Sequence, residues 1–138
     1  MQVSFKKMTF FVAVAISTSC LFSCEKDEGK LPDIAFKTGG SYLSADKIVA
    51  KGETVTVGIT ADKTEDKDVL KTFNVSASFD GAANSTVSNT TLTSAQADHF
   101  EVDVPVTARN QAGTEKYTFT VTNRDGLVNS VSLTLTVQ

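Results

Sequence analysis

Hydrophobic and polar residues alternate with a period of two along much of residues 33–138. Valine, leucine, isoleucine or phenylalanine, with an occasional tyrosine or alanine, stands at every second position, with mostly threonine or serine between, over residues 54–60, 73–79, 100–107, 117–122 and 131–137. Successive side chains of a β-strand point to opposite faces of a sheet, so each segment predicts a strand with one buried face. One buried and one solvated face per strand is typical of antiparallel sheets.

Weaker segments and turn residues complete this pattern. Residues 34–37 predict a first strand, residues 42–49 a further one, and the polar residues 84–92 an edge strand. Pro105 cannot donate to a strand ladder, so its strand should lie at an edge or carry a bulge there. Residues 123–126, Asn-Arg-Asp-Gly, predict a hairpin turn between the last two strands. The other turn signals are Lys51-Gly52, Asp80-Gly81 and Ala112-Gly113.

The strand pattern predicts an all-β fold for residues 33–138. About seven strands in this length favour an antiparallel two-sheet sandwich, and a small barrel is the alternative. Helical periodicity is not convincing in any window. The predicted organisation is therefore a single β-domain that follows a separate N-terminal region at residues 1–32.

The C-terminal part resembles immunoglobulin-like and PKD-like domains. Residues 112–121, Ala-Gly-Thr-Glu-Lys-Tyr-Thr-Phe-Thr-Val, resemble their penultimate strand, and residues 123–126 and 130–137 resemble the closing turn and last strand. The resemblance implies an Ig-like sandwich, in which Tyr117 is either a tyrosine corner or a plain core tyrosine. The chain has no tryptophan and no cysteine after residue 24, so it departs from the antibody-type branch.

Residues 1–23 have the three-part layout of a secretory signal peptide. Lys6 and Lys7 precede an apolar run over residues 8–16, which small polar residues then end. A transmembrane helix needs roughly 18 or more continuous apolar residues, and this run is about half as long. We therefore expect residues 1–23 to be removed from the mature protein.

The segment Leu21-Phe22-Ser23-Cys24 resembles the lipobox of bacterial lipoproteins. The resemblance implies cleavage before Cys24 and attachment of acyl chains to it. Cys20 is the rival site, but Ser17 stands where the motif has an apolar residue. Each buried methylene contributes about 0.8 kcal/mol, so two or three acyl chains would hold the protein on a membrane.

The residues after Cys24 resemble the surface-export signal of Bacteroidetes lipoproteins. The resemblance rests on Lys26, Asp27 and Glu28, and it implies an outer-membrane protein displayed at the cell surface. A solvated linker is the alternative interpretation. Residues 24–32 are thus predicted to be an acylated N-terminus with a flexible acidic tether.

Composition excludes several kinds of chemistry. The net charge of −3 and the lack of a basic stripe argue against a nucleic-acid partner. Because Cys20 and Cys24 are the only cysteines, the β-domain has no disulfide framework, no thiol nucleophile and no cysteine metal site. His99 is the only histidine and no Gly-x-Ser-x-Gly elbow occurs, so we expect no catalytic residues and no cofactor.

Two possible ligand sites remain in the sequence. Asp62, Glu65, Asp66 and Asp68 form the densest acidic cluster, which fits either a solvated loop or, less well, a calcium site, since the usual calcium-loop spacing is absent. We therefore predict no metal site, with calcium left open at this loop. Tyr42 is the one aromatic residue that we expect to be exposed for a glycan, and a flat aromatic platform is not expected.

These observations favour a lipid-anchored surface module that contacts a protein or glycan, with no catalytic activity. Binding residues commonly lie on loops that a rigid scaffold positions. The alternative function is an accessory or structural subunit of an outer-membrane envelope assembly. The expected partners are the membrane, through the lipid, and an unidentified ligand.

Overall fold

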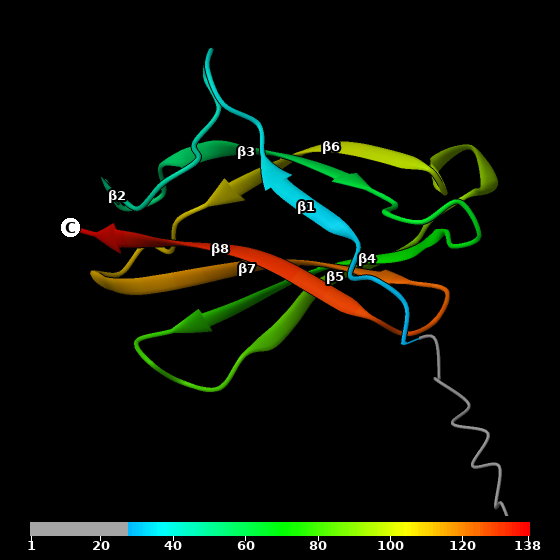
Figure 1. The fold of residues 1–138 in the computed structure, drawn as a ribbon. Coiled ribbons are helices and arrows are strands. Elements are labelled where there is room, and N and C mark those ends of the chain that lie inside the picture. Colours follow the sequence, from blue (N-terminus) through cyan, green and yellow to red (C-terminus); the bar gives the residue numbers. More distant parts are fainter. Residues whose placement is uncertain (1–27) are drawn as a thin grey trace, which may run out of the picture.

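The computed structural model describes residues 28–138, which form eight strands and one short 3₁₀ helix (Figure 1). The predicted signal peptide, Cys24, Lys26 and Asp27 lie outside the described residues, and Glu28 is exposed. The elements are β1 (Asp33–Phe36), β2 (Lys47–Val49), β3 (Thr54–Asp62), β4 (Leu70–Phe79), β5 (Ser85–Thr91), η1 (Ser94–Gln96), β6 (His99–Thr107), β7 (Gly113–Asn123) and β8 (Val128–Val137).

The strands form two facing sheets, which confirms the sandwich and not the barrel. One sheet has three strands in the order β1-β3-β6, and the other has five in the order β2-β8-β7-β4-β5. Figure 1 shows the smaller sheet above the larger one. All pairings are antiparallel except that of β2 with β8, which is parallel. The strand predicted over residues 42–49 is short, because only Lys47–Val49 pairs along β8.

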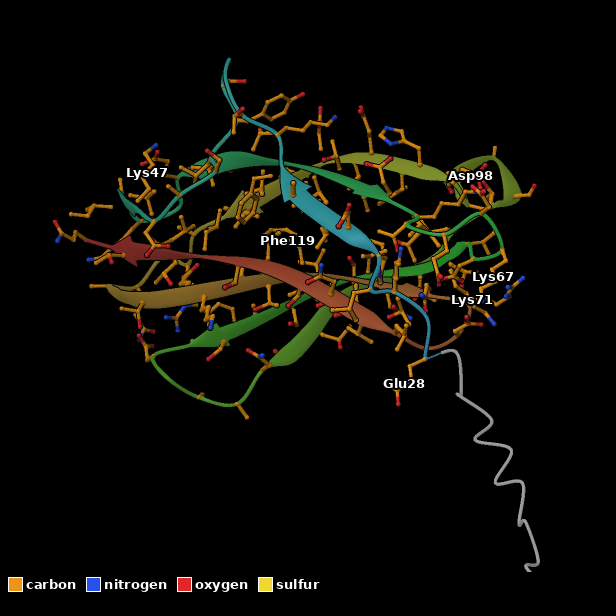
Figure 2. The ribbon with its side chains drawn as sticks, in the orientation of Figure 1. Glu28, Lys47, Lys67, Lys71, Asp98 and Phe119 are labelled. Atoms are coloured by element: carbon orange, nitrogen blue, oxygen red, sulfur yellow. The ribbon has the colours of Figure 1, made fainter. Side chains whose placement is uncertain are left out.

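Alternate residues of the long strands fill the space between the sheets. Val57 in β3 is fully buried, as are Phe119 in β7 and Leu135 in β8, and Figure 2 shows Phe119 between the two layers. Complete burial of one such side chain contributes about 1.5–3 kcal/mol. This core holds the domain together in the absence of disulfides and fixes the outer faces on which polar side chains lie.

Edges and turns agree with most sequence predictions. β5 is exposed along its whole length at one edge, and β6, which contains Pro105, is an edge strand of the smaller sheet. β7 and β8 form the predicted hairpin. The short helix η1 was not predicted, although Thr93 and Gln96 make the capping box that starts it. Among residues 28–138, no helix is long and apolar enough to cross a bilayer.

The prediction of a flexible tether up to Pro32 is wrong for its last residues. The Pro32 side chain is almost fully buried, and its carbonyl accepts a hydrogen bond from Asn129. The Leu31 carbonyl accepts another from the Thr64 hydroxyl. Polar composition suggested a solvated linker, but these partners come from distant parts of the chain and could not be seen in the local sequence.

Tyr117 lies in the core and is not a tyrosine corner. A tyrosine corner bonds back to the backbone, whereas the Tyr117 hydroxyl donates to the Glu115 carboxylate at 2.8 Å. Glu115 is fully buried and also accepts the backbone N–H and the Nε–H of Arg109, at 2.9 and 2.8 Å. Arg109 in turn donates to Asp80 at 2.9 Å. We call Asp80, Arg109, Glu115 and Tyr117 the Glu115 cluster.

Candidate functional site

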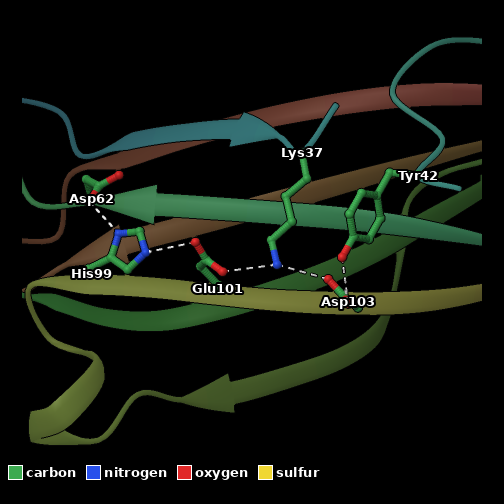
Figure 3. Close-up of polar contacts among 6 residues, drawn as sticks. All are labelled: Lys37, Tyr42, Asp62, His99, Glu101 and Asp103. Atoms are coloured by element: carbon green, nitrogen blue, oxygen red, sulfur yellow. Dashed lines mark hydrogen bonds and ion pairs between the residues drawn. The ribbon is translucent and has the colours of Figure 1, made fainter. Parts of the chain in front are cut away.

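A continuous row of polar side chains crosses the outer face of the three-stranded sheet (Figure 3). β6 supplies three of them, the end of β3 supplies one, and the segment after β1 supplies two. We call this set the polar row, and its members are Asp62, His99, Glu101, Lys37, Asp103 and Tyr42.

The alternation of β6 explains why its three residues share one face. Phe100 and Val106 are buried, while His99, Glu101 and Asp103 are exposed on the opposite side. Antiparallel pairing places Asp62 directly opposite His99. The strand register therefore brings the first members of the row together, and about half of each of these side chains stays accessible to solvent.

Direct contacts join neighbouring members of the row. His99 Nδ1 lies 2.6 Å from Asp62 Oδ1, and its Nε2 lies 3.1 Å from Glu101 Oε1. Lys37 Nζ lies 3.1 Å from Glu101 and 3.0 Å from Asp103. The Tyr42 hydroxyl donates to the other Asp103 oxygen at 3.0 Å. Each of these carboxylates is thus oriented by a partner before any ligand arrives.

Gly58 allows the second half of the row to form. It pairs with Asp103 in the middle of β3, and the backbone N–H of Lys37 donates to its carbonyl at 2.8 Å. A Cβ at position 58 would lie 2.7 Å from Lys37 Cβ and 2.9 Å from Tyr42 Cδ1. Glycine in a strand interior commonly marks such a close approach. Lys37 and Tyr42 can therefore lie on the sheet only because this residue has no side chain.

The contacts shift the pKa values of four members of the row, Lys37, His99, Glu101 and Asp103, in the directions that favour their charged forms. The hydrogen bond to Asp103 raises the pKa of Tyr42, which keeps that hydroxyl neutral. The hydrogen bond with Asp62, and next that with Glu101, raises the pKa of His99. Lys37 lowers the pKa of Glu101 and Asp103, and its own pKa is raised by the same two carboxylates. At neutral pH Glu101 and Asp103 are therefore ionised and Lys37 carries its positive charge, with His99 closer to protonation than a free histidine.

His99 does not have the geometry of a serine–histidine catalytic site. A serine–histidine site needs one imidazole nitrogen directed at a hydroxyl nucleophile. Both nitrogens of His99 instead face carboxylates. The row offers fixed hydrogen-bond acceptors and a net negative charge, which suit cationic or hydrogen-bond-donating groups of a ligand.

The acidic residues singled out in the sequence do not come together. Asp62 belongs to the polar row, Glu65 accepts the backbone N–H of Lys30, and Asp68 is buried against Asn123 and its neighbour Val69. Within residues 28–138, no three histidine, cysteine, aspartate or glutamate side chains gather closely enough to hold a metal ion. The loop from Asp62 to Asp68 therefore does not assemble the carboxylate cage that calcium prefers.

Tyr42 is half-buried and not a free aromatic platform. Its ring packs over Gly58, and the ammonium of Lys37 lies 5.6 Å from the ring centre. It also borders a shallow groove of about 350 Å³, which Lys47 and Glu53 also line. The polar part of Tyr42 thus belongs to the row, and the groove continues the polar surface beyond it.

Sequence reasoning did not single out Lys37, Glu101 or Asp103. One feature of the sequence could have indicated this surface. The polar positions of residues 99–103 are charged or ionisable, whereas the polar positions of the other predicted strands are mostly threonine and serine. The contribution of Lys37 could not be inferred, because it depends on how the segment after β1 crosses Gly58.

Comparisons with known proteins identify the fold and no family. No family model matches the chain, and no curated protein matches its sequence. The superoxide reductase (neelaredoxin) from Ignicoccus hospitalis is a similar solved structure, with a TM-score of 0.55, 9% identity, and coverage of 79% of this chain and 81% of that one. A variant of the same reductase gives a TM-score of 0.52, 9% identity, and coverage of 78% and 80%.

The CARDB domain of a protein from Pyrococcus furiosus has a TM-score of 0.45 at 11% identity, covering 78% of this chain and 90% of that one. At these identities the likeness concerns the β-sandwich alone. The chain is an Ig-like β-sandwich, and its function has to be inferred from its own surface.

Proposed function

We propose that this chain is a lipid-anchored cell-surface module that binds a protein ligand through the polar row and catalyses no reaction. The observation that carries the proposal is the row itself. Its carboxylates are held in place by Lys37, His99 and Tyr42, yet Asp62, Glu101 and Asp103 remain about half exposed. Such preorganised groups lose little conformational freedom when a partner binds.

Charge indicates the kind of ligand. The row has three carboxylates against one lysine and one histidine, so a basic protein surface fits it best. Complementary charge mainly raises the association rate and the specificity, and it weakens with salt. A glycan that donates hydroxyl hydrogen bonds is the other ligand class, and the binding experiment below distinguishes it.

The anchor is proposed from the sequence. Cys24 follows the lipobox-like segment, and the export signal at Lys26, Asp27 and Glu28 would carry the lipoprotein to the outer face of the outer membrane. Anchoring supports the binding role, because a module confined to a surface meets ligands at a high effective concentration.

The alternative function is that of a subunit of an envelope assembly, and the experiments below can distinguish it from the binding module. Fibre subunits that exchange strands have a vacant strand position. Here β8 pairs with β7 along its length and with β2 over its last three residues, Leu135–Val137, so the chain supplies its own last strand. A stable stoichiometric complex recovered from the envelope would favour the assembly role.

Anchoring and display are tested in cells. Metabolic labelling with a fatty acid should mark the wild-type chain and Cys20→Ala but not Cys24→Ala. Protease shaving of whole cells should reach the domain, and a variant with alanine at positions 26, 27 and 28 should stay lipidated but become protected. Labelling of Cys24→Ala, or unchanged exposure of the triple variant, would contradict this part of the proposal.

Binding is tested with a charge-matched pair of variants. The lipidated chain on beads is used to capture ligands from detergent-solubilised envelope and from a glycan array. Glu101→Gln with Asp103→Asn should no longer capture the protein ligand. High salt should reduce capture by the wild-type chain in the same way, because both changes weaken the attraction between charges. Asp66→Asn with Asp125→Asn removes the same charge at exposed positions outside the row and should retain capture. Equal capture by both variants, or a glycan as the sole ligand, would overturn the proposal.

A further inference from the structure

The segment just before β1 is fastened to one end of the sandwich. The Lys30 backbone N–H donates to Glu65 Oε2 at 3.0 Å, and the Thr64 hydroxyl donates to the Leu31 carbonyl at 2.8 Å. Asn129 Nδ2 donates to the Pro32 carbonyl at 2.9 Å, and Asn123 Nδ2 lies 3.3 Å from the Lys30 carbonyl. Four side chains from two separate parts of the chain thus bond to three consecutive residues.

Packing reinforces these hydrogen bonds. Pro32 is almost fully buried and restricts the backbone where the segment enters β1. Gly29 has a φ of +70°, and a Cβ there would lie 3.1 Å from Leu127 Cδ1. The chain therefore turns closely over Leu127, in a conformation that favours glycine. The fixed part of the chain begins at Gly29, four residues before the first strand.

The end of the sandwich to which residues 30–32 are bonded can be described by the connections that it carries. It carries the connection between β3 and β4 and the turn between β7 and β8, and we call it the tether end. Figure 2 shows Glu28, Lys67 and Lys71 at this end, with Lys47 at the opposite end. The opposite end carries the β4–β5 and β6–β7 connections and the C-terminus (Figure 1). Strands of ten or eleven residues separate the two ends by roughly 35 Å.

The length of chain outside the fastened segment limits where an anchored domain can lie. Cys24 and Gly29 are five positions apart, which allows a fully extended reach of about 18 Å. If the segment up to Asp33 were free, the reach would be about 30 Å. Fastening therefore shortens the spacer to about half the length of the domain.

We propose that residues 29–32 act as an orienting clamp, which holds the tether end against the lipid surface and projects the opposite end outward. The inference rests on the lipid anchor of the proposed function. It identifies the partner of the tether end as the membrane to which Cys24 is attached. The polar row then runs away from the membrane, from Asp62 and His99 near the tether end to Tyr42.

Site-specific labelling of the lipidated full chain tests the clamp. The domain has no cysteine of its own, so Asp66→Cys at the tether end and Ala112→Cys at the opposite end can each carry one fluorophore; both native residues are exposed. The proteins are placed on phosphatidylcholine vesicles that contain a headgroup-nitroxide lipid as quencher. Quenching at position 66 should exceed quenching at position 112 several-fold.

Two further variants separate the clamp from the fold. Glu65→Ala with Asn129→Ala removes two of the bonds, and an insertion of about ten Gly/Ser residues before Gly29 lengthens the spacer by roughly 17 Å without changing the domain. Both changes should bring the two quenching values closer together. The clamp is overturned if both labels are quenched equally in the parent, or if neither change alters their ratio. Failure of the parent to float with vesicles would instead overturn the lipid anchor itself, and the clamp with it.

Discussion

The polar row and the Glu115 cluster are built from the same types of residue and differ in burial. In each, basic side chains and a tyrosine hydroxyl contact the carboxylates: Lys37, His99 and Tyr42 in the row, and Arg109 and Tyr117 in the cluster. Glu115 is fully buried and has three donors on its two oxygens, whereas Glu101 and Asp103 are about half exposed. Removing a partner from a buried charge pair is costly, and exposed pairs contribute little to stability. The comparison assigns the Glu115 cluster to folding and leaves the row available for a ligand.

The largest effect is expected from Glu115→Ala. It leaves Arg109 and the Tyr117 hydroxyl without their acceptor and opens a cavity, so unfolding free energy should fall by about 3–5 kcal/mol. Urea melts of the lipid-free chain from residue 25 measure it. Glu115→Gln preserves the volume and one acceptor oxygen and should lose less. A loss below about 1 kcal/mol in Glu115→Ala, the range of an exposed pair, would remove the distinction between the two groups of charges.

Gly58→Ala should give the next largest effect. Its new Cβ would overlap Lys37 and Tyr42, and overpacking of this kind costs about 1–3 kcal/mol. The same melts measure it, with Thr60→Ala as a control that removes atoms from the same face of β3. The variant should also lose ligand capture, because Lys37 and Tyr42 move. Unchanged stability together with unchanged capture would contradict the role of Gly58 in building the row.

A smaller effect on stability is expected from Glu101→Gln with Asp103→Asn. These side chains are exposed, and their ion pairs with Lys37 are screened by solvent, so the loss should be smaller than that of Gly58→Ala in the same melts. Lowered pKa values mean that the stability these carboxylates add is present above their unfolded pKa and is lost as pH falls through the folded pKa. The variant should therefore differ most from the parent at neutral pH and least in acid.

The smallest expected effect is the titration of His99. Its pKa is raised, first by Asp62, so protonation stabilises the folded state below a pH of about 6.5, and this contribution is lost as pH rises through the folded pKa. NMR titration of its ring protons measures the value directly. Asp62→Asn should lower the pKa of His99 more than Glu101→Gln does. A pKa at or below about 6.5 in the parent would show that the first contact of the row does not form in solution.

The fold class could be predicted from the sequence because the features that determine it, alternating strands and turn residues, lie in short segments of the chain. Period-two alternation places Phe119 and Leu133 inward, and turn residues such as Asp125-Gly126 set the hairpin. The three-and-five division of the strands was not predictable, since it depends on how strands distant in sequence pair. The parallel pairing of β2 with β8 joins residues nearly ninety positions apart.

The site was less predictable than the fold. His99, Tyr42 and Asp62 were each noticed separately, as the only histidine, as an aromatic residue expected to be exposed, and as part of the acidic loop. Only the antiparallel register between β3 and β6, and the crossing of Lys37 over Gly58, join them. The buried position of Glu115 was also hidden, because the apolar alternation of its strand is clear only from Tyr117 onward.

The most direct test measures stability and ligand capture together in two variants. The probe is the protein ligand that the wild-type chain retains from solubilised envelope. Glu101→Gln with Asp103→Asn should keep an unfolding free energy close to that of the parent and lose the ligand. Glu115→Gln, assayed at a temperature where it is folded, should be less stable and keep the ligand. A row variant that still retains the ligand at the parent level would contradict the assignment of binding to the polar row.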